Sequence, residues 1–259
     1  MPELAEVEFF RKQWDPGIGQ TVHRIAWHPR ARIFRGIPEK AFTNALAGSR
    51  LLASFSHGKQ MIFQGENAWI GVHLGMTGRL TVEPPGFQPG KHDHLVLFQT
   101  RRALVFTDPR LFGRILFHEG AEAPEWWTNR PPDLLSAAFT PTALHEFLQR
   151  RKGAPIKAAL LMQDRFPGIG NWMADEVLWQ SRIGPSRRCG TLTPDETRSL
   201  WKSLRKICRD ALRIIGRDFS DPPDSWLFLH RWKAGGSCPR CGLPLHRAAI
   251  GGRTACWCE

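Results

Sequence analysis

The pattern of apolar residues changes about halfway along the chain, and this change limits the folds that the chain can adopt. In the first half, short runs rich in Val, Ile, Leu and Phe lie at 51–84 and 94–117, with turn sequences at 65–67, 84–86 and 99–102. Short runs at this spacing predict strands joined by hairpins. We therefore expect an antiparallel β-sandwich or barrel, preceded by an amphipathic helix over about residues 5–14.

The second half of the chain has a helical period, and residues 119–132 have the composition of a linker. One helix is expected to start at Thr140-Pro141 and another to cover 154–166. The clearest helix follows Thr193, which can be its N-cap, with Glu196 as the reciprocal partner of a capping box. Its apolar stripe, and the glycine expected to end it, are Leu200, Leu204, Ile207, Ala211, Ile214 and Gly216.

Composition and charge restrict the function classes. The 259 residues are 42% hydrophobic and 23% charged, which is ordinary for a globular protein and argues against a disordered chain. No apolar run approaches the roughly 18 residues of a membrane span, and the start MPELAEVEFF is acidic where a secretory signal is basic. The net charge of +12 points to a polyanion, with nucleic acid the leading candidate, although a solvated basic surface would carry the same charge.

Four of the six cysteines crowd near the end of the sequence with the spacing of a zinc site. Cys238 and Cys241 can both reach one tetrahedral Zn²⁺ ion, and a basic hairpin then leads to Cys256 and Cys258. The alternative is a set of buried thiols with one incidental pair. Because the second pair is C-x-C, either Cys256 supplies the fourth ligand through a strained loop or that ligand lies beyond Glu259.

Two closely spaced glycines in the segment Gly168-Ile-Gly170-Asn171 precede a predicted helix. Free backbone N–H groups at a helix start favour an anion, and glycines permit its close approach. The segment therefore predicts a phosphate-binding turn. A plain packing turn between two helices explains the same residues.

The N-terminus offers a nucleophile if Met1 is removed. Pro2 would then carry a secondary amine, and α-amino groups have pKa values near 8. Such an amine can attack a carbonyl or masked aldehyde and form an iminium, with Glu3 supplying or removing protons. The alternative is a disordered start without a chemical role.

Six segments, in this order, resemble the Fpg/Nei DNA glycosylases, with the start closer to the formamidopyrimidine-DNA glycosylase (MutM) branch. They are MPELAEVE, Gly58-Lys59, HLGMTGRL from His73, DPRLFG from Asp108, Gly168 to Glu176, and the terminal cysteines. The resemblance spans almost the whole chain. It implies an α+β protein with an N-terminal antiparallel β-sandwich (1–130), a helix–two-turn–helix DNA-binding domain (131–235) and a zinc-finger-like hairpin (236–259).

The resemblance also implies residue roles. Pro2 would attack C1′ of a damaged nucleotide, Glu3 would protonate the sugar oxygen or the departing base, Glu6 would support this site, and Lys59 would hold a phosphate. Extrusion of a base leaves a gap that apolar wedges and one Arg can fill. The expected gap-filling residues are Met76, Arg110 and Phe112, and the other expected DNA-binding residues are His73, Lys157, Asn171 and Arg253.

The implied function is a bifunctional DNA glycosylase/AP lyase of base excision repair that excises oxidised bases through a Schiff base and β,δ-elimination. Its partner would be duplex DNA with damaged bases or abasic sites. We expect a Zn²⁺-containing monomer of the bacterial cytoplasm, nucleoid-associated when bound, without a membrane partner. The alternatives are a non-catalytic protein of the same fold that binds damaged or abasic DNA, as retention of Met1 would create, and a basic zinc-ribbon module that binds RNA.

Three departures from the family pattern bear on these expectations. Ala5 stands where the family start has Pro, and Met162 stands where an acidic residue is usual. The stretch from Gly216 to Cys238 is short and rich in Pro and Trp, where the Fpg branch has a long Gly-rich loop. Ring-opened purines, hydantoins or oxidised pyrimidines are therefore at least as strongly expected as 8-oxoguanine.

Overall fold

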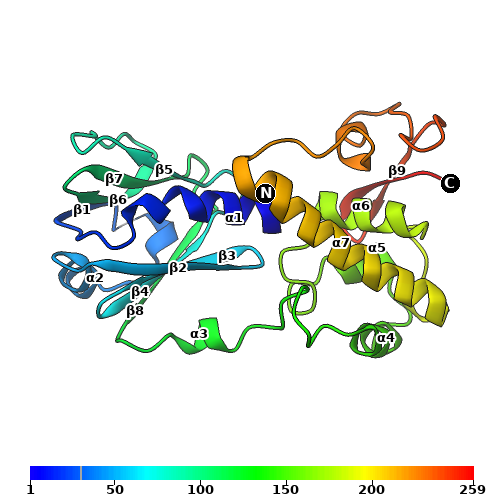
Figure 1. Ribbon diagram of the computed structural model, residues 1–259, viewed down its shortest axis with the longest axis horizontal. Helices are drawn as coiled ribbons and strands as arrows, with labels where there is room; N and C mark the ends of the chain where they lie inside the picture. Colours follow the sequence, from blue (N-terminus) through cyan, green and yellow to red (C-terminus); the bar gives the residue numbers. More distant parts are fainter. Residues whose placement is uncertain (30) are drawn as a thin grey trace. The chain divides into compact units, whose positions relative to one another are not determined.

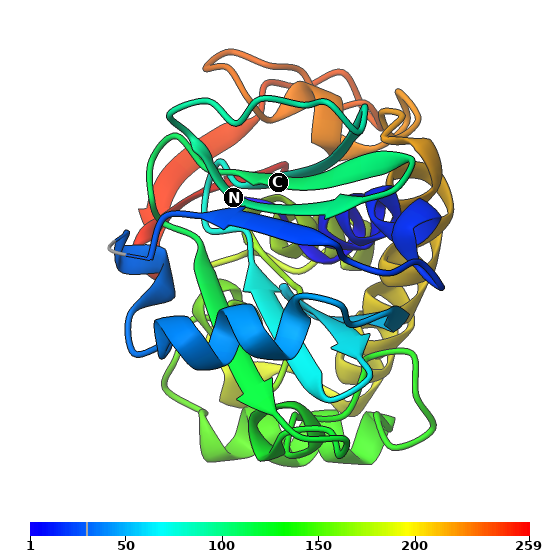
Figure 2. The same ribbon diagram turned by 90° about the vertical axis from the view of Figure 1, so that its left-hand side faces the viewer.

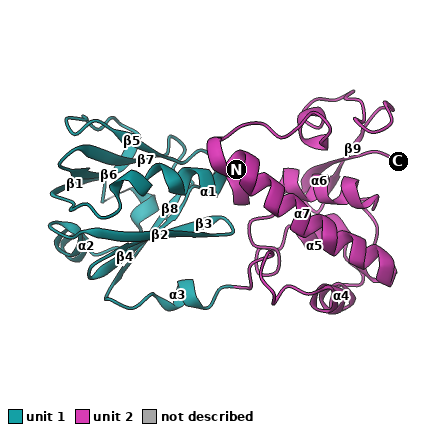
Figure 3. Cartoon of the chain, viewed as in Figure 1, with its two compact units in different colours: residues 1–2, 6–130 teal, residues 3–5, 131–259 magenta. Residues whose placement is uncertain are grey.

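The computed structural model describes residues 1–29 and 31–259, which form two compact units (Figure 3). The first unit comprises residues 1–2 and 6–130, and the second comprises residues 3–5 and 131–259. The first unit contains the large sheets, and the second contains the long helices and a C-terminal hairpin (Figure 1).

The first unit contains two four-stranded antiparallel sheets, one of order β1-β6-β7-β5 and one of order β2-β3-β4-β8 (Figures 1 and 2). The expected β-sandwich is therefore confirmed. The strands are β1 (Arg24–Trp27), β2 (Leu51–His57), β3 (Gln60–Gly65), β4 (Ala68–His73), β5 (Arg79–Glu83), β6 (Asp93–Gln99), β7 (Arg102–Thr107) and β8 (Arg114–Glu119).

Apolar side chains from both sheets meet in one buried cluster, which includes Phe63 of β3 and Phe106 of β7. Trp14 joins this cluster and its indole N–H is 3.2 Å from the Thr81 carbonyl. The helix expected over 5–14 is observed within one residue at each end. The helical segments of this unit are α1 (Leu4–Gln13), whose first two residues belong to the second unit, η1 (Asp15–Gly17), η2 (Arg32–Phe34), α2 (Glu39–Leu46) and α3 (Glu125–Thr128).

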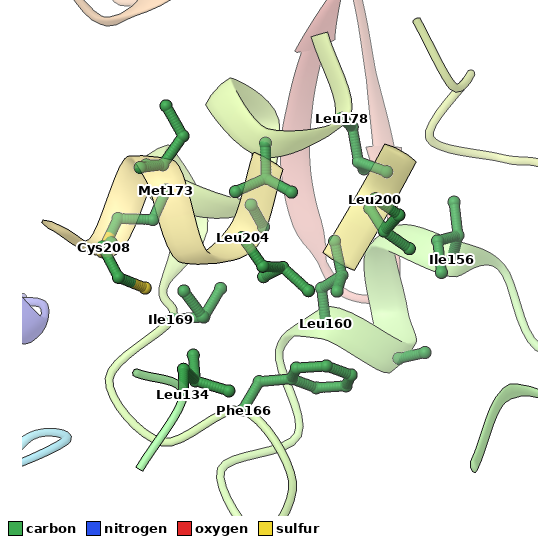
Figure 4. Packing of buried hydrophobic residues seen from close by; sticks show 14 of the residues in the cluster. Leu134, Ile156, Leu160, Phe166, Ile169, Met173, Leu178, Leu200, Leu204 and Cys208 are labelled. Carbon is green, nitrogen blue, oxygen red and sulfur yellow. The ribbon is translucent and has the colours of Figure 1, made fainter. Parts of the chain in front are cut away.

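The second unit packs its helices around α6 and α7, whose buried faces share one apolar core (Figure 4). Its helical segments are α4 (Pro141–Arg150), α5 (Ile156–Leu160), α6 (Asn171–Ser181), η3 (Cys189–Thr191), α7 (Pro194–Asp218) and η4 (Leu227–His230). Strands β9 (His246–Ile250) and β10 (Arg253–Trp257) form the antiparallel hairpin, and β10 packs against α6.

Helix α7 confirms the predicted capping box, because the Thr193 hydroxyl and the Glu196 carboxylate each accept the other residue's backbone N–H. One detail of the prediction is wrong. The helix passes Gly216 and ends at Asp218, where Phe219 takes the left-handed conformation with φ of 64°. At the end of the stripe, Ile215 is buried and Ile214 is partly buried against the same core.

The helix expected over 154–166 is also shorter than predicted, since α5 covers only Ile156–Leu160. The Gln163 side chain accounts for this early end. Its amide donates to the carbonyls of Leu161 and Ile169, at 2.9 Å and 2.8 Å, and so holds residues 161–169 in a loop. Within the described residues, no helix is long and apolar enough to cross a membrane.

Replacing Thr193 with Ala tests the capping box. The variant leaves the N–H of Glu196 without its side-chain acceptor, so the free energy of unfolding should fall by about 1 kcal/mol. Urea unfolding measures this loss. Ser199→Ala, on an exposed position of the same helix, is the matched control and should stay within about 0.5 kcal/mol of wild type. Equal losses in both variants would contradict the capping role.

Candidate active site

The carboxylate of Glu3 is bound by the N-terminus of α6. Its Oε2 accepts the N–H groups of Gly170 and Met173, at 2.9 Å and 3.1 Å, and its Oε1 accepts the N–H of Trp172 at 3.0 Å. Glu3 is 3% exposed, so these backbone donors replace water around the carboxylate. The side chain that follows Pro2 in the sequence is thereby held in one position.

Gly170 is required for this arrangement, because a Cβ atom at this position would lie 2.2 Å from Cδ of Glu3. The sequence correctly indicated an anion at this helix start. The prediction that this anion is a phosphate is wrong for this turn, because the Glu3 carboxylate occupies the N–H groups of Gly170, Trp172 and Met173. Trp172 also places its ring against Phe228, with centroids 4.9 Å apart.

Pro2 and Glu6 flank this carboxylate in the sequence. Pro2 is partly buried and follows Met1, which is 50% exposed. Glu6 lies in the first turn of α1 and is also partly buried. The first two residues are held in place through the two residues that follow them. Glu3 binds the start of α6, and the backbone N–H of Leu4 donates to the carbonyl of Gly168 at 3.1 Å.

Lys59 and His73 lie near each other in the first unit. Lys59 lies in the turn between β2 and β3, and His73 pairs with its neighbour Gln60 across β3 and β4. Burial lowers the pKa of His73, and the nearby charges of Lys59 and Arg114 lower it further. The Nδ1 atom of His73 is 3.1 Å from the N–H of Gly75, so it acts as an acceptor. The neutral ring then carries its proton on Nε2.

The three predicted gap-filling residues lie on two turns that touch. Met76 and Phe112 are 43% and 45% exposed, and the Arg110 guanidinium lies 4.8 Å from the Phe112 ring centroid. A Cβ atom at Gly75 would lie 2.3 Å from the carbonyl carbon of Phe112, so the two turns pack backbone to backbone. The structure thus gathers Met76, Arg110 and Phe112 on one exposed edge of the first unit.

Buried Asp108 holds these turns in place. Its Oδ1 accepts the Thr77 hydroxyl at 2.8 Å, and its Oδ2 accepts the Gly113 N–H at 2.7 Å. One carboxylate therefore links the turn that carries Met76 to the turn that carries Phe112. Asp108 begins the segment DPRLFG in the sequence, but the sequence alone predicted no role for it.

Lys157 differs most from its expected place. Its side chain is fully buried, and its ammonium lies 2.5 Å from Asp175 Oδ1 and 2.7 Å from the carbonyl of Asn171. Burial lowers the pKa of Lys157, while Asp175 partly offsets this shift. A direct contact between Lys157 and a DNA phosphate is therefore wrong for this structure, because the ammonium already binds two buried oxygens.

Asp175 is the centre of a buried ionic network that the sequence did not reveal. Its Oδ2 accepts from the Arg231 guanidinium at 2.5 Å and from the N–H of Cys256 at 3.2 Å. Lys157, Asp175 and Arg231 are at most 4% exposed. One carboxylate thus joins α5, α6, β10 and the chain just after η4.

Asn171 and Arg253 are brought close together in the second unit. The Asn171 side-chain amide donates to the carbonyl of Thr254 at 3.0 Å, and Arg253 is the exposed neighbour of Thr254 on β10. The turn of this hairpin packs on α5, since a Cβ atom at Gly251 would lie 2.7 Å from Cβ of Ala158. The amide of Asn171 and the exposed Arg253 therefore lie close to the same part of strand β10.

Three of the four predicted zinc ligands form one cluster. Among the described residues, the sulfur atoms of Cys238, Cys241 and Cys258 lie within 4.8 Å of one another, whereas Cys256 is not part of this group. Burial alone would raise the pKa of Cys238, but N–H donors from Arg240, Trp179 and Cys241 outweigh it and lower the pKa to about 7. Three closely spaced thiols, one of which has a lowered pKa, fit Zn²⁺.

Glu176 is a second buried acid on α6 that sequence reasoning missed. Burial raises its pKa to about 7, although hydrogen bonds from Gln180 and the backbone of Phe228 and Leu227 partly offset this shift. The N–H of Phe228 lies 3.1 Å from its Oε2. The sequence contained one indication of this site, namely two adjacent acids, Asp175 and Glu176, in a predicted helix whose neighbouring residues are mostly apolar. The whole stretch from residue 172 to 179 is buried.

Replacing Asp175 with Asn tests the ionic network. The variant leaves two buried cations without a counter-charge, so the free energy of unfolding should fall by about 3–5 kcal/mol. The matched control is Asp210→Asn on α7, whose ion pair with Lys206 is partly exposed and should cost less than about 1 kcal/mol. Urea unfolding distinguishes the two, and a loss for Asp175→Asn no larger than for the control would contradict the network.

Replacing Glu176 with Gln tests the raised pKa. As the pH rises from the ordinary value of 4.5 to about 7, the unfolded chain loses a proton that folded Glu176 retains. Ionisation of the unfolded chain thus reduces wild-type stability over this window, and the Gln variant has no such titration. The melting temperature of Glu176→Gln minus that of wild type should therefore increase from pH 5 to pH 7.5. A difference that stays constant between pH 5 and pH 7.5 would contradict the shift.

Comparison with known proteins agrees with this geometry. The profile of the formamidopyrimidine-DNA glycosylase N-terminal domain matches residues 1–115, and that of the formamidopyrimidine-DNA glycosylase H2TH domain matches residues 131–221. The chain is 36% identical to formamidopyrimidine-DNA glycosylase of Thermomicrobium roseum and 33% identical to that of Chloroflexus aurantiacus. These alignments cover 100% of the chain and 98% and 96% of the relatives.

Solved structures agree as well. Wild-type Lactococcus lactis Fpg (MutM) in complex with DNA containing an oxidised pyrimidine has a TM-score of 0.87 at 26% identity, with 99% of this chain and 98% of that chain covered. An L. lactis Fpg mutant bound to DNA containing Fapy-dG has a TM-score of 0.86 at 26% identity, with the same coverage. The chain belongs to the formamidopyrimidine-DNA glycosylase (Fpg/MutM) family.

Proposed function

We propose that the protein is a bifunctional DNA glycosylase/AP lyase of base excision repair, with Pro2 as nucleophile. The observation that carries this proposal is the position of Glu3. Its carboxylate is fixed by the N-terminus of α6 and is joined by one peptide unit to the Pro2 nitrogen. A group that can transfer a proton thus directly follows the proposed secondary amine in the sequence, and nucleophilic attack and departure of a base both require such a group.

The proposed reaction begins when the lone pair of the Pro2 nitrogen attacks C1′ of the damaged nucleotide. The glycosidic bond breaks, and the base leaves with its electron pair and takes up a proton. Opening of the sugar ring, with Glu3 protonating its oxygen, gives a Schiff base. Loss of a C2′ proton then expels the 3′ phosphate, a second elimination expels the 5′ phosphate, and water releases the sugar fragment. This scheme requires removal of Met1, because an amide nitrogen lacks the free lone pair.

The remaining predicted residues fit supporting roles in this scheme. Lys59 and His73, neighbours in the first unit, would hold phosphates beside the damaged nucleotide. Met76, Arg110 and Phe112 share one exposed edge, and there they would fill the gap that base extrusion leaves in the duplex. Glu6 would support the N-terminal site from the first turn of α1.

In the second unit, Asn171 and Arg253 would bind backbone phosphates, since both border one surface. Such contacts give affinity rather than sequence preference. Lys157 would act indirectly, because its ammonium holds the carbonyl of Asn171. When bound, Zn²⁺ would tie the hairpin together through Cys238, Cys241 and Cys258 with one further ligand.

The substrate would be duplex DNA with ring-opened purines, oxidised pyrimidines or abasic sites. The similar L. lactis structures are complexes with DNA that contains an oxidised pyrimidine or Fapy-dG. The curated relatives come from bacteria. Their origin supports a location in the bacterial cytoplasm, and we propose in addition that the protein acts as a monomer that associates with the nucleoid when bound to DNA.

Borohydride trapping on a duplex with one abasic site tests the proposed chemistry. Protein with Met1 removed, verified by intact mass, should give a covalent adduct that peptide mapping places on Pro2. The matched control is the same chain with an N-terminal extension, in which the Pro2 nitrogen is an amide while every side chain is unchanged. It should give no adduct.

Two outcomes would count against the proposal. An adduct that maps to a lysine, or that forms equally in the extended chain, would remove Pro2 as nucleophile. Tight binding of abasic duplex without any adduct would favour the non-catalytic alternative, a protein of this fold that binds damaged DNA.

A further inference from the structure

Three polar side chains form a row across the neighbouring strands β3, β4 and β8 (Figure 1). Gln60 of β3 pairs with His73 of β4, and His73 pairs with Arg114 of β8. Directly paired residues point to the same face of a sheet, so the three side chains lie side by side. Their chain neighbours Met61 and Ile115 point to the other face and belong to the buried core. The polar row therefore lies on the face of the sheet that points away from that core.

Trp126 of α3 packs against this same face. Its indole sits on Gly71 of β4, since a Cβ atom at Gly71 would lie 2.5 Å from Cη2 of Trp126. Trp127 meets it edge to face with centroids 6.4 Å apart, and within the described residues no cation and no parallel ring covers the indole. The indole, the polar row and the ring of Phe112 line a pocket of about 300 Å³. This volume is at the lower end of the range of small-ligand pockets.

The polar groups of this pocket suit an anion. No carboxylate lines it, and among the described residues none pairs with the exposed Arg114 guanidinium. His73 accepts the N–H of Gly75 through Nδ1, so its Nε2 carries a proton that it can donate. The pocket thus offers a positive charge and an N–H donor beside an aromatic wall. This combination fits a ligand that joins an anion to a flat ring.

We propose that this pocket binds one nucleotide, whose phosphate contacts Arg114 and His73 and whose base packs against Trp126. A nucleotide has both required parts, and the net charge of +12 attracts such anions. Two sources share this chemistry, namely a nucleotide of the bound DNA strand and a free nucleoside monophosphate. The inference rests on the proposed function for the first source, in which His73 already holds a phosphate. It adds a ring for the base and a second cation to that contact.

Binding of 2′-deoxyguanosine 5′-monophosphate (dGMP), measured by isothermal titration calorimetry, tests the pocket. Deoxyguanosine lacks the phosphate and inorganic phosphate lacks the base, so each should bind at least about 5-fold more weakly than dGMP. Arg114→Gln removes a charged donor and should weaken dGMP binding by about 10-fold. Trp126→Leu should weaken it by about 5-fold or more, and Trp126→Phe, which keeps an aromatic face, should recover most of the affinity.

The matched controls remove the same chemical groups away from the pocket. Arg101→Gln removes an exposed guanidinium from the turn between β6 and β7, and Trp257→Leu removes a partly buried indole from β10. Both should bind dGMP as wild type does. Because Arg114 is exposed, Arg114→Gln keeps the test valid even where Trp126→Leu fails to fold.

Three results would overturn the inference. Equal losses in the pocket and control variants would reduce the binding to an effect of overall charge or stability. Inorganic phosphate that binds as tightly as dGMP would remove the role of the base. Absence of saturable dGMP binding at millimolar concentrations would remove the site.

Competition with an abasic duplex distinguishes the two sources. If a nucleotide of the strand occupies the pocket, dGMP should compete with the duplex, and Arg114→Gln should bind the duplex more weakly. If a free nucleotide occupies it, dGMP and the duplex should bind together, and the variant should keep the wild-type affinity for the duplex. Failure of the proposed function would appear separately, as absence of a trapped adduct on abasic DNA, because dGMP binding requires no cleavage.

Discussion

The binding of the Glu3 carboxylate to the N-terminus of α6 is the interaction on which the candidate site depends. Three backbone N–H groups hold a side chain that lies two residues from the start of the sequence. Chain termini are commonly poorly ordered unless tertiary contacts hold them. Here the contact joins residues 167 positions apart, and it holds Glu3, the proposed acid, which directly follows the proposed nucleophile Pro2 in the sequence.

The sequence predicted the fold well where local rules decide it. Turn residues and apolar runs indicated the region of strands β2 to β8 but not β1, and Thr193 and Glu196 were sufficient for the start of α7. Helix ends were less predictable, because side-chain contacts such as those of Gln163 compete with the helical backbone bonds. Phe219 was unexpected as a left-handed residue, since most helices that end in this way use Gly.

The candidate site was predictable only in part, for a physical reason. Gly168 to Asn171 indicated an anion at a helix start, but the sequence could not say that the anion is a side chain of the same protein. Likewise Lys157 has the charge of a phosphate contact, and only the fold brings Asp175 to it. Such pairs depend on distant segments meeting, which no local pattern encodes.

Helix α6 supports two kinds of function along its length. Its first turn binds Glu3, whereas Asp175 and Glu176 in its middle hold the segment after α7. The proposed acid and the segment after α7 therefore rest on one rigid element but on separate residues of it. Residues between Phe219 and Ser237 can then change over evolutionary time without disturbing the contacts that hold Glu3, so that one scaffold can carry different sequences in this segment.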